Sequence, residues 1–192
     1  MKLRDWQENA FPLWWEKKRG IIKVVTGGGK TVFAIHCLTK YLEENQINSI
    51  LIVVPSIALL DQWYESLSLS FSSKEIALNG GGEQIEDVAK ICISTIDSLK
   101  NLIDKVDPEN TLLIVDECHK IGTEKRGEML TNNWHATLGL SATPERYLRK
   151  EGRKIISQPI KGTAKRLISA FDDAQIALDL HRDEKERSEN VM

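Results

Sequence analysis

Short apolar runs alternate along this chain with longer segments in which apolar residues recur every three or four positions. The short runs are rich in β-branched residues and predict strands at Ile21–Val25, Ile50–Val54, Ile91–Ser94, Leu112–Val115 and His135–Leu140, with a shorter one at Glu75–Leu78. The helical pattern covers Trp6–Trp15, Thr31–Glu44, Ile57–Leu69 and Ile96–Lys105. Such alternation is typical of an α/β fold, so the sequence predicts a mostly parallel sheet sandwiched by helices.

Composition describes an ordinary globular protein. The chain has 192 residues, of which 41% are hydrophobic and 28% charged, which suits one folded domain with a sizeable core. No apolar run approaches the ~20 residues that a membrane-spanning helix needs. Charged and polar residues near the N-terminus, from Arg4 to Glu8, interrupt any signal-peptide pattern. We therefore expect a cytoplasmic protein that does not contact a membrane.

A glycine-rich segment joins the first predicted strand to the helix after it, and it reads Thr26, Gly27, Gly28, Gly29, Lys30 and Thr31. Glycines let several backbone N–H groups turn toward one anion, and a helix N-terminus favours phosphate. In the phosphate-loop pattern G-x-x-x-x-G-K-[ST], the lysine reaches the β- and γ-phosphates and the hydroxyl ligates magnesium. This chain has Val24 at the first position of that pattern. The alternative is a plain glycine turn followed by a surface lysine.

Two adjacent carboxylates, Asp116 and Glu117, follow the fully apolar run Leu112–Val115. Open α/β sheets bind ligands at the carboxyl ends of their strands, so Asp116 is a candidate magnesium ligand. Glu117 could position and deprotonate an attacking water. The alternative is a solvated turn at the end of a strand. A second glycine-rich stretch, Asn79–Gly82, has no following lysine or hydroxyl, so we interpret it as a flexible corner.

Taken in order, five segments resemble the motifs of superfamily 2 helicases and translocases. Asp116-Glu117-Cys118-His119 resembles the D-E-x-H motif, and Ser141-Ala142-Thr143 resembles the S-A-T motif. The other three matches are the adenine-reading glutamine segment, motif Ia and the threonine motif, here at Leu3–Gln7, Ile50–Trp63 and Ile91–Leu99. The branch that these segments resemble contains type III restriction translocases and nucleotide-excision-repair helicases. The resemblance covers residues 1–146 and identifies a RecA-like phosphate-loop domain, the N-terminal lobe of a DEAD/DEAH-box enzyme.

The resemblance implies a role for each matching residue. ATP and Mg²⁺ are the implied cofactors, with Gln7 contacting adenine and Lys30, Asp116, Glu117 and His119 serving catalysis. Nucleic acid is the implied partner, DNA in preference to RNA, and its candidate contacts are Pro55, Ser56 and Thr95. The S-A-T residues would couple hydrolysis to movement. A net charge of −2 does not by itself indicate a nucleic-acid binder.

Residues 147–192 lie beyond the resemblance and form a basic and then acidic stretch, which we expect to be a helical extension with a partly disordered tail. The 192 residues leave no room for a second RecA-like lobe, which could be supplied by another chain. We therefore expect an ATP-binding lobe that is weak or inactive alone. Two alternatives are a nucleotide-gated regulatory module without turnover and an unrelated phosphate-loop enzyme such as a small-molecule kinase.

Overall fold

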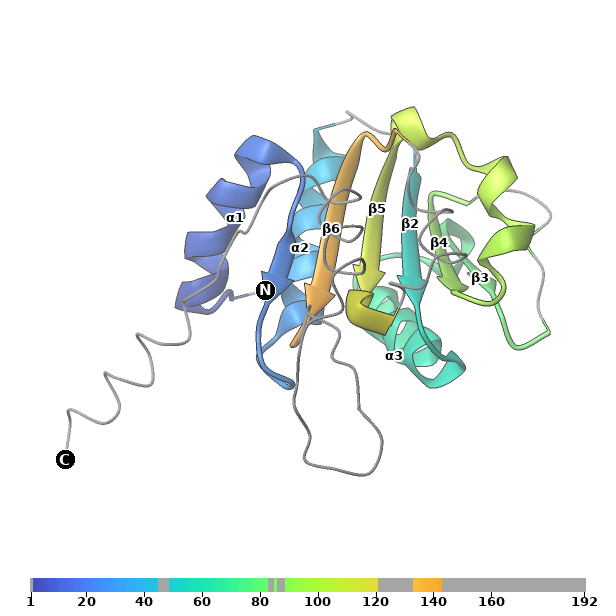
Figure 1. Cartoon of the computed structure of the whole chain (residues 1–192), viewed down its shortest axis with the longest axis horizontal. Coiled ribbons are helices and arrows are strands. Elements are labelled where there is room, and N and C mark those ends of the chain that lie inside the picture. The colour runs from blue at the N-terminus through green and yellow to red at the C-terminus, as the bar shows by residue number, and fades with distance from the viewer. Residues whose placement is uncertain (1, 45–48, 83–84, 86–88, 121–132, 143–192) are drawn as a thin grey trace, which may run out of the picture.

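Six parallel strands form one sheet in the computed structural model, which describes residues 2–44, 49–82, 85, 89–120 and 133–142. The strands are β1 (Ile21–Lys23), β2 (Ser49–Val54), β3 (Ile76–Asn79), β4 (Ile91–Thr95), β5 (Thr111–Asp116) and β6 (Ala136–Ser141). Their order across the sheet is β1-β6-β5-β2-β4-β3, and every neighbouring pair is parallel. The arrowheads of β1, β6, β5 and β2 therefore point the same way in Figure 1. The predicted α/β fold and its strands are confirmed.

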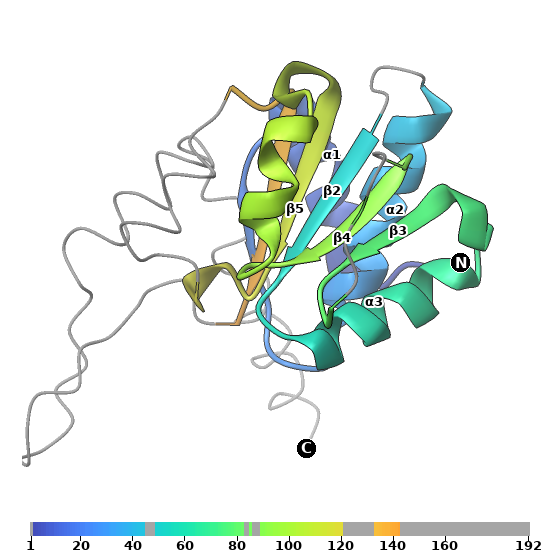
Figure 2. The same cartoon turned by 90° about the vertical axis from the view of Figure 1, so that its right-hand side faces the viewer.

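Three α-helices cover one face of this sheet (Figures 1 and 2). They are α1 (Asp5–Lys17), α2 (Lys30–Glu43) and α3 (Ile57–Ser68), each within a few residues of its predicted bounds. The opposite face is covered by short 3-10 turns, among them η2 (Leu99–Asn101) and η3 (Ile103–Lys105). The described residues contain three further 3-10 turns, η1 (Ser73–Glu75), η4 (Pro108–Asn110) and η5 (Cys118–Lys120).

The prediction of one α-helix over Ile96–Lys105 is wrong, because η2 and η3 stand there. Hydrogen bonds between residues three apart hold the segment, from Ser98 N–H to Thr95 O and from Leu102 N–H to Leu99 O. The carbonyl of Ser98 also accepts a bond from Asn79 Nδ2 at 3.0 Å. These bonds divert the backbone from the pattern of a continuous α-helix.

Alternating residues along each central strand divide the core into two layers. In β2, Ile50 and Ile52 face the layer beneath the three helices, whereas Leu51 and Val53 face the layer beneath the 3-10 turns. Buried tryptophans fill both layers, Trp14 and Trp63 in the first and Trp134 in the second. Both faces of the central strands are covered, as expected for a parallel sheet. Trp6 and Trp14 of α1 are buried in the first layer and Trp15 packs against it, so these tryptophans pack the first helix against the sheet.

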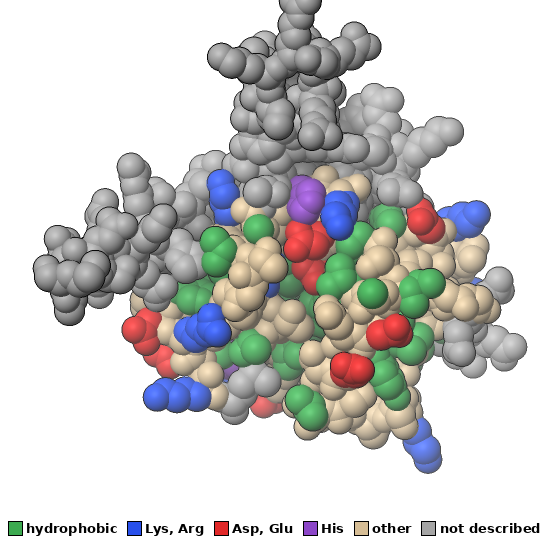
Figure 3. All heavy atoms as spheres, turned by 90° about the horizontal axis from the view of Figure 1, so that it is seen from below, with side chains coloured by type: hydrophobic (Ala, Val, Ile, Leu, Met, Phe, Trp, Pro, Cys, Tyr) green, Lys and Arg blue, Asp and Glu red, His purple; other side chains and the backbone are tan. Residues whose placement is uncertain are grey.

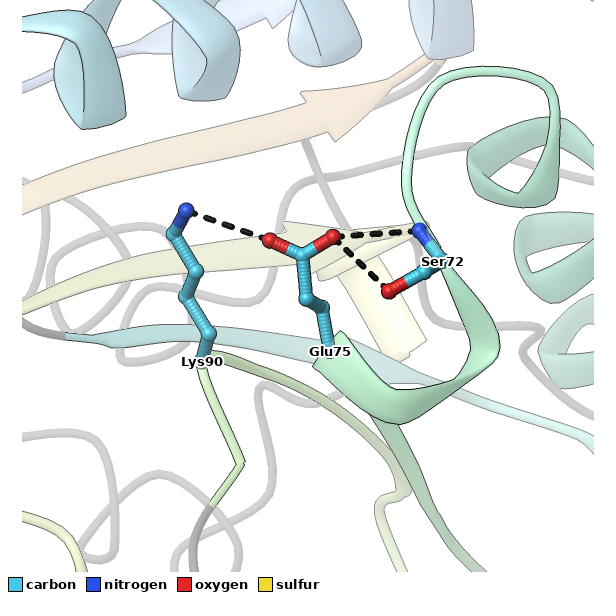
Figure 4. Close-up of polar contacts among 3 residues, drawn as sticks. All are labelled: Ser72, Glu75 and Lys90. Atoms are coloured by element: carbon cyan, nitrogen blue, oxygen red, sulfur yellow. Dashed lines mark hydrogen bonds and ion pairs between the residues drawn. The ribbon is translucent and has the colours of Figure 1, made fainter.

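An exposed carboxylate fixes the chain where it enters the edge strand β3. Glu75 accepts hydrogen bonds from the backbone N–H and the hydroxyl of Ser72, each at 3.1 Å, and from Lys90 Nζ at 3.3 Å (Figure 4). The backbone bond is the largest of the three effects, and together they hold the pKa of Glu75 below its usual value.

In the part of the chain that the structure describes, no helix has the length and apolar character needed to cross a membrane.

Candidate nucleotide-binding site

The carboxyl ends of β1, β6 and β5 bring the two predicted chemical motifs to one edge of the sheet. Lys23 of β1 pairs with Ser141 of β6, and Leu140 pairs with Asp116 of β5. Only β6 separates the glycine loop from the acidic pair, a distance of roughly 10 Å between strand axes. Figure 3 views this edge and shows acidic, basic and histidine side chains gathered near its centre. The convergence that an ATP site requires is present.

The glycine loop runs directly into the N-terminus of α2. Gly29 is the N-cap of the helix at φ 91°, and Gly27 has φ 78°, so both adopt the left-handed conformations that favour glycine. Helix α2 begins at Lys30, and Thr31 lies in its first turn. Unpaired N–H groups at a helix start, preceded by such a loop, make an anion site.

Val24, the departure from the phosphate-loop pattern, packs against the middle of this loop. A Cβ atom on Gly28 would lie 2.3 Å from Val24 Cγ1 and 3.0 Å from Val25 O, which leaves no room for any other residue there. Lys30 is buried, and its Nζ donates to Val24 O at 3.1 Å. A backbone carbonyl thus holds the lysine inside the loop.

Helix α1 holds the glycine loop from outside. Trp6 Nε1 donates to Gly28 O at 3.1 Å, and Gln7 Nε2 donates to Gly29 O at 2.8 Å. The other end of the Gln7 amide accepts from Arg4 N–H at 2.8 Å, so both ends of this buried side chain are bonded. Gln7 therefore lies beside the site, and its contact with adenine stays a prediction.

Both oxygens of the Asp116 carboxylate accept hydrogen bonds. Oδ1 accepts from the backbone N–H of Glu117 at 2.8 Å, and Oδ2 accepts from Trp63 Nε1 at 2.9 Å. Asp116 is only 5% exposed, and it makes no ion pair with a cationic side chain of the described residues. A buried carboxylate without a counter-charge suits a bound cation.

Glu117, His119 and Ser141 form a second group beside Asp116. Glu117 has φ 47°, and this left-handed turn ends β5 and starts η5. His119 Nδ1 lies 3.2 Å from Glu117 Oε2 and 2.9 Å from Ser141 Oγ. The D-E-x-H and S-A-T segments are therefore in direct contact, across the ends of β5 and β6.

Cys118, which lies between Glu117 and His119 in the sequence, does not belong to this group of polar side chains. It is fully buried in the layer beneath the 3-10 turns, and burial, followed by the nearby carboxylates, raises the pKa of its thiol to about 12. A thiol with so high a pKa is not a nucleophile at neutral pH.

The nucleic-acid candidates lie along the same edge, at the ends of the next two strands. Val54 pairs with Thr95, so Pro55 and Ser56 follow β2 beside the end of β4. Ser56 is the N-cap of α3, and its hydroxyl oxygen accepts from Leu59 N–H at 3.4 Å. Thr95 donates to Ser98 Oγ at 3.0 Å. These are the capping and turn roles expected of such residues, and contact with nucleic acid stays a prediction.

The structure describes the S-A-T segment only in part. Ala142 follows β6 and is partly buried, whereas Thr143 lies outside the described residues, as does the whole 147–192 extension. Sequence reasoning assigned no chemistry to Trp63 or Trp6, although each donates to a site residue. Trp63 belongs to the apolar stripe of α3, with Leu60 and Leu67, and that stripe predicts burial only.

Taken together, these features define a RecA-like phosphate-loop domain. The family model described as "Type III restriction enzyme, res subunit" matches residues 1–146. The chain belongs to this family and carries the N-terminal RecA-like domain of a superfamily 2 helicase.

Similar proteins and structures agree with this assignment. The DNA 3'-5' translocase XPB2 of Sulfurisphaera tokodaii is 30% identical over 201 residues, covering 100% of this chain and 44% of the relative. The Pyrococcus furiosus Hef helicase domain has a TM-score of 0.70 at 17% identity, over 96% of this chain and 40% of that one. The Sulfolobus solfataricus SWI2/SNF2 ATPase core in complex with dsDNA has a TM-score of 0.61 at 20% identity, over 75% and 32%. The chain thus spans less than half the length of each.

A second, overlapping match concerns the C-terminal part of the chain. The family model for chorismate binding enzymes matches residues 105–192. Anthranilate synthase component 1 of Thermus thermophilus is 45% identical over 53 residues, which is 28% of this chain and 12% of that relative. Most of the matched range lies outside the described residues.

Proposed function

We propose that residues 1–146 are the ATP-binding lobe of an ATP-dependent helicase or translocase that acts on DNA in preference to RNA. One observation carries the proposal: the glycine loop and the acidic pair lie at the same edge of the sheet, separated by β6 alone. The His119–Ser141 contact supports it further, because it joins the acidic pair to the candidate coupling segment. The names of XPB2 and of the SWI2/SNF2 complex with dsDNA support DNA as the partner.

The described residues fit a magnesium–nucleotide complex. Among the described residues, the donors to the buried Asp116 carboxylate are the neutral N–H groups of Trp63 and Glu117, and a buried carboxylate with such neighbours suits a bound cation. Lys30 donates a hydrogen bond to a backbone carbonyl, which is a neutral acceptor. A phosphate oxygen is charged and accepts more strongly, so a bound phosphate would replace the carbonyl as the partner of Lys30. Thr31 stands one residue into the helix whose start would bind the phosphates.

In this proposal the chain binds ATP with the N–H groups of the glycine loop and Lys30. Thr31 and Asp116 hold Mg²⁺, which neutralises charge on the transferring phosphoryl group when bound. Glu117 accepts the proton of the attacking water and orients it in line with the γ-phosphate. His119 contacts both Glu117 and Ser141, so a movement of Glu117 at the end of β5 would be transmitted to Ser141 at the end of β6.

Full turnover requires more than this lobe. An arginine finger stabilises the transition state of comparable phosphoryl transfers by about 10³–10⁵ in rate, and we propose that a second RecA-like lobe supplies it. We therefore expect the 192-residue chain to bind Mg·ATP and to hydrolyse it slowly.

The test compares nucleotide binding by the wild-type chain, Lys30→Ala and a control, Lys40→Ala, measured with a fluorescent ATP analogue. Lys40 is exposed on α2 and pairs with Glu43. We expect Lys30→Ala to abolish binding and Lys40→Ala to leave it unchanged. Equal binding by all three, or by none, contradicts the proposal.

Hydrolysis separates the remaining alternatives. We expect Glu117→Gln to bind Mg·ATP like wild type and to lose the slow hydrolysis that DNA stimulates. Binding without any turnover, even with DNA and a second lobe present, would favour the regulatory module. Stimulation by a small metabolite in place of DNA would favour the kinase.

The match to chorismate binding enzymes raises a second and weaker candidate function for the C-terminal residues, namely binding of chorismate or a related diacid. The aligned portion is 12% of anthranilate synthase component 1, so we expect it to lack most of that enzyme's site. A calorimetric titration of the whole chain with chorismate tests this candidate, and we expect no heat of binding. Saturable binding would make the chain bifunctional.

A further inference from the structure

Trp63 reaches across from α3 to the end of β5 and contacts the candidate metal ligand. Its indole Nε1 lies 2.9 Å from Asp116 Oδ2, with Trp63 only 1% exposed and Asp116 only 5% exposed. The other carboxylate oxygen is held by the backbone N–H of Glu117 at 2.8 Å. Two donors on two different oxygens fix the plane of the carboxylate as well as its position.

The acceptor makes this tryptophan different from two others in the same core. Trp14 is equally buried, and its indole donates to the backbone carbonyl of Thr137 at 3.0 Å. Trp6 donates to the carbonyl of Gly28. Trp63 donates to a carboxylate instead, and hydrogen bonds to charged groups are shorter and roughly twice as strong as neutral ones. Filling the core alone would need no such donor, because a buried phenylalanine packs without one.

We propose that Trp63 is a positioning residue for the magnesium site, an inference that rests on the proposed nucleotide function. Its N–H holds the Asp116 carboxylate in the orientation in which that residue receives Mg²⁺. Partners of this kind, behind a metal ligand, orient it, and their loss costs about 10- to 100-fold in metal affinity or activity. Trp63 lies about two turns along α3. The helix begins after Pro55 and Ser56, so the same side chain ties the metal site to the helix that follows the candidate nucleic-acid segment.

The experiment uses Trp63→Phe, which keeps an aromatic ring in the core and removes the N–H. Trp14→Phe is the matched control, because it removes an equally buried indole bond, which Trp14 makes to the backbone carbonyl of Thr137, a residue with no proposed role in the site. Affinity for ADP is measured in EDTA and then over a range of Mg²⁺ concentrations. We expect Trp63→Phe to need about 10- to 100-fold more Mg²⁺ for half-maximal enhancement of binding, with its affinity in EDTA unchanged. Trp14→Phe should match wild type in both measurements.

A second measurement uses the wild-type protein, in which Trp63 and Asp116 are unchanged. In wild-type protein labelled with ¹⁵N, the indole N–H signal of Trp63 should shift when Mg²⁺ is added to the ADP complex, whereas that of Trp14 should not. Phe variants of the other four tryptophans assign the signal by elimination, so this measurement holds even if Trp63→Phe fails to fold. A Trp63 signal that ignores Mg²⁺ overturns the inference.

The outcomes separate this inference from the function on which it rests. If wild type binds Mg·ADP, Lys30→Ala does not, and Trp63→Phe has the Mg²⁺ requirement of wild type, only the positioning role fails. If wild type and Lys30→Ala both fail to bind, the nucleotide function fails and the positioning role fails with it.

Discussion

Two glycine turns follow the two outermost strands of the sheet, β1 and β3, and both lie on the side where the parallel strands have their carboxyl ends. Only one of these two turns has the features of a phosphate site. The first, after β1, contains Gly27 and Gly29, and the second, after β3, contains Gly81 and Gly82, all four with positive φ. The first leads directly into α2, with Lys30 at the helix start. The second packs through Gly80 against the side chains of Thr95 and Leu60. Left-handed glycines are therefore not enough, and the helix and lysine that follow decide the chemistry.

The second turn also differs from the expectation of a flexible corner at its first residue. Asn79 is buried, and its Nδ2 donates to Ser94 Oγ at 2.9 Å and to Ser98 O at 3.0 Å. This side chain ties the end of β3 to β4 and to the segment after it. The turn is thus anchored where it begins.

The largest effect should come from Gly28→Ala in the first turn. The new Cβ would lie 2.3 Å from Val24 Cγ1, so the loop must shift. Overpacking of this kind costs about 1–3 kcal/mol. If nucleotide binding requires the original loop geometry, the same cost lowers nucleotide affinity by about 5- to 150-fold. Binding of a fluorescent nucleotide measures the change.

The double variant Val24→Ala/Gly28→Ala is the control for that mechanism. Removing Val24 Cγ1 makes room for the new methyl, so the double variant should lose less affinity than the two single changes add up to. Wild-type binding by Gly28→Ala would show that the close contact with Val24 does not shape the site.

Gly80→Ala, in the second turn, should lower the free energy of unfolding and leave the affinity for nucleotide unchanged. Its Cβ would lie 2.8 Å from Thr95 Cγ2 and 3.2 Å from Leu60 Cδ1, so we expect a loss of about 1–3 kcal/mol in the free energy of unfolding. Urea denaturation measures this loss, and Thr95→Ser in the same chain should recover part of it by removing Cγ2. A loss of nucleotide affinity equal to that of Gly28→Ala would remove the distinction between the two turns.

The sequence carried most of the fold because the central strands are buried on both faces and therefore appear as unbroken apolar runs. It also predicted that the glycine loop and the acidic pair lie on one side of the sheet, because the carboxyl ends of parallel strands lie together there, with Lys30 in the helix after β1 and Asp116 at the end of β5. The helix predicted over Ile96–Lys105 failed for a physical reason. Ile96, Leu99 and Leu102 recur at intervals of three, a spacing that successive 3-10 turns satisfy as well as an α-helix.

Contacts between residues far apart in the sequence could not be predicted from the apolar pattern. Trp63 and Asp116 are 53 positions apart, and their bond depends on how α3 packs across the end of β5. Gln7 reaches Gly29 across 22 positions because α1 lies beside α2. A periodic pattern states which residues are buried, and it leaves open which atoms they meet.

The smallest effect concerns the start of β3, at the end of the strand opposite the second turn. Three hydrogen bonds lower the pKa of Glu75 in the folded protein, so its contribution to stability is present above the pKa of an unfolded carboxyl and is lost as pH falls below it. Because Glu75 is exposed, solvent screens this contribution. Glu75→Gln should therefore lower Tm slightly at neutral pH, and the difference from wild type should vanish in acid. Glu65→Gln, at an exposed position on α3, is the control. A Tm difference that persists unchanged into acid would mean that side-chain shape, and not the carboxylate, anchors β3.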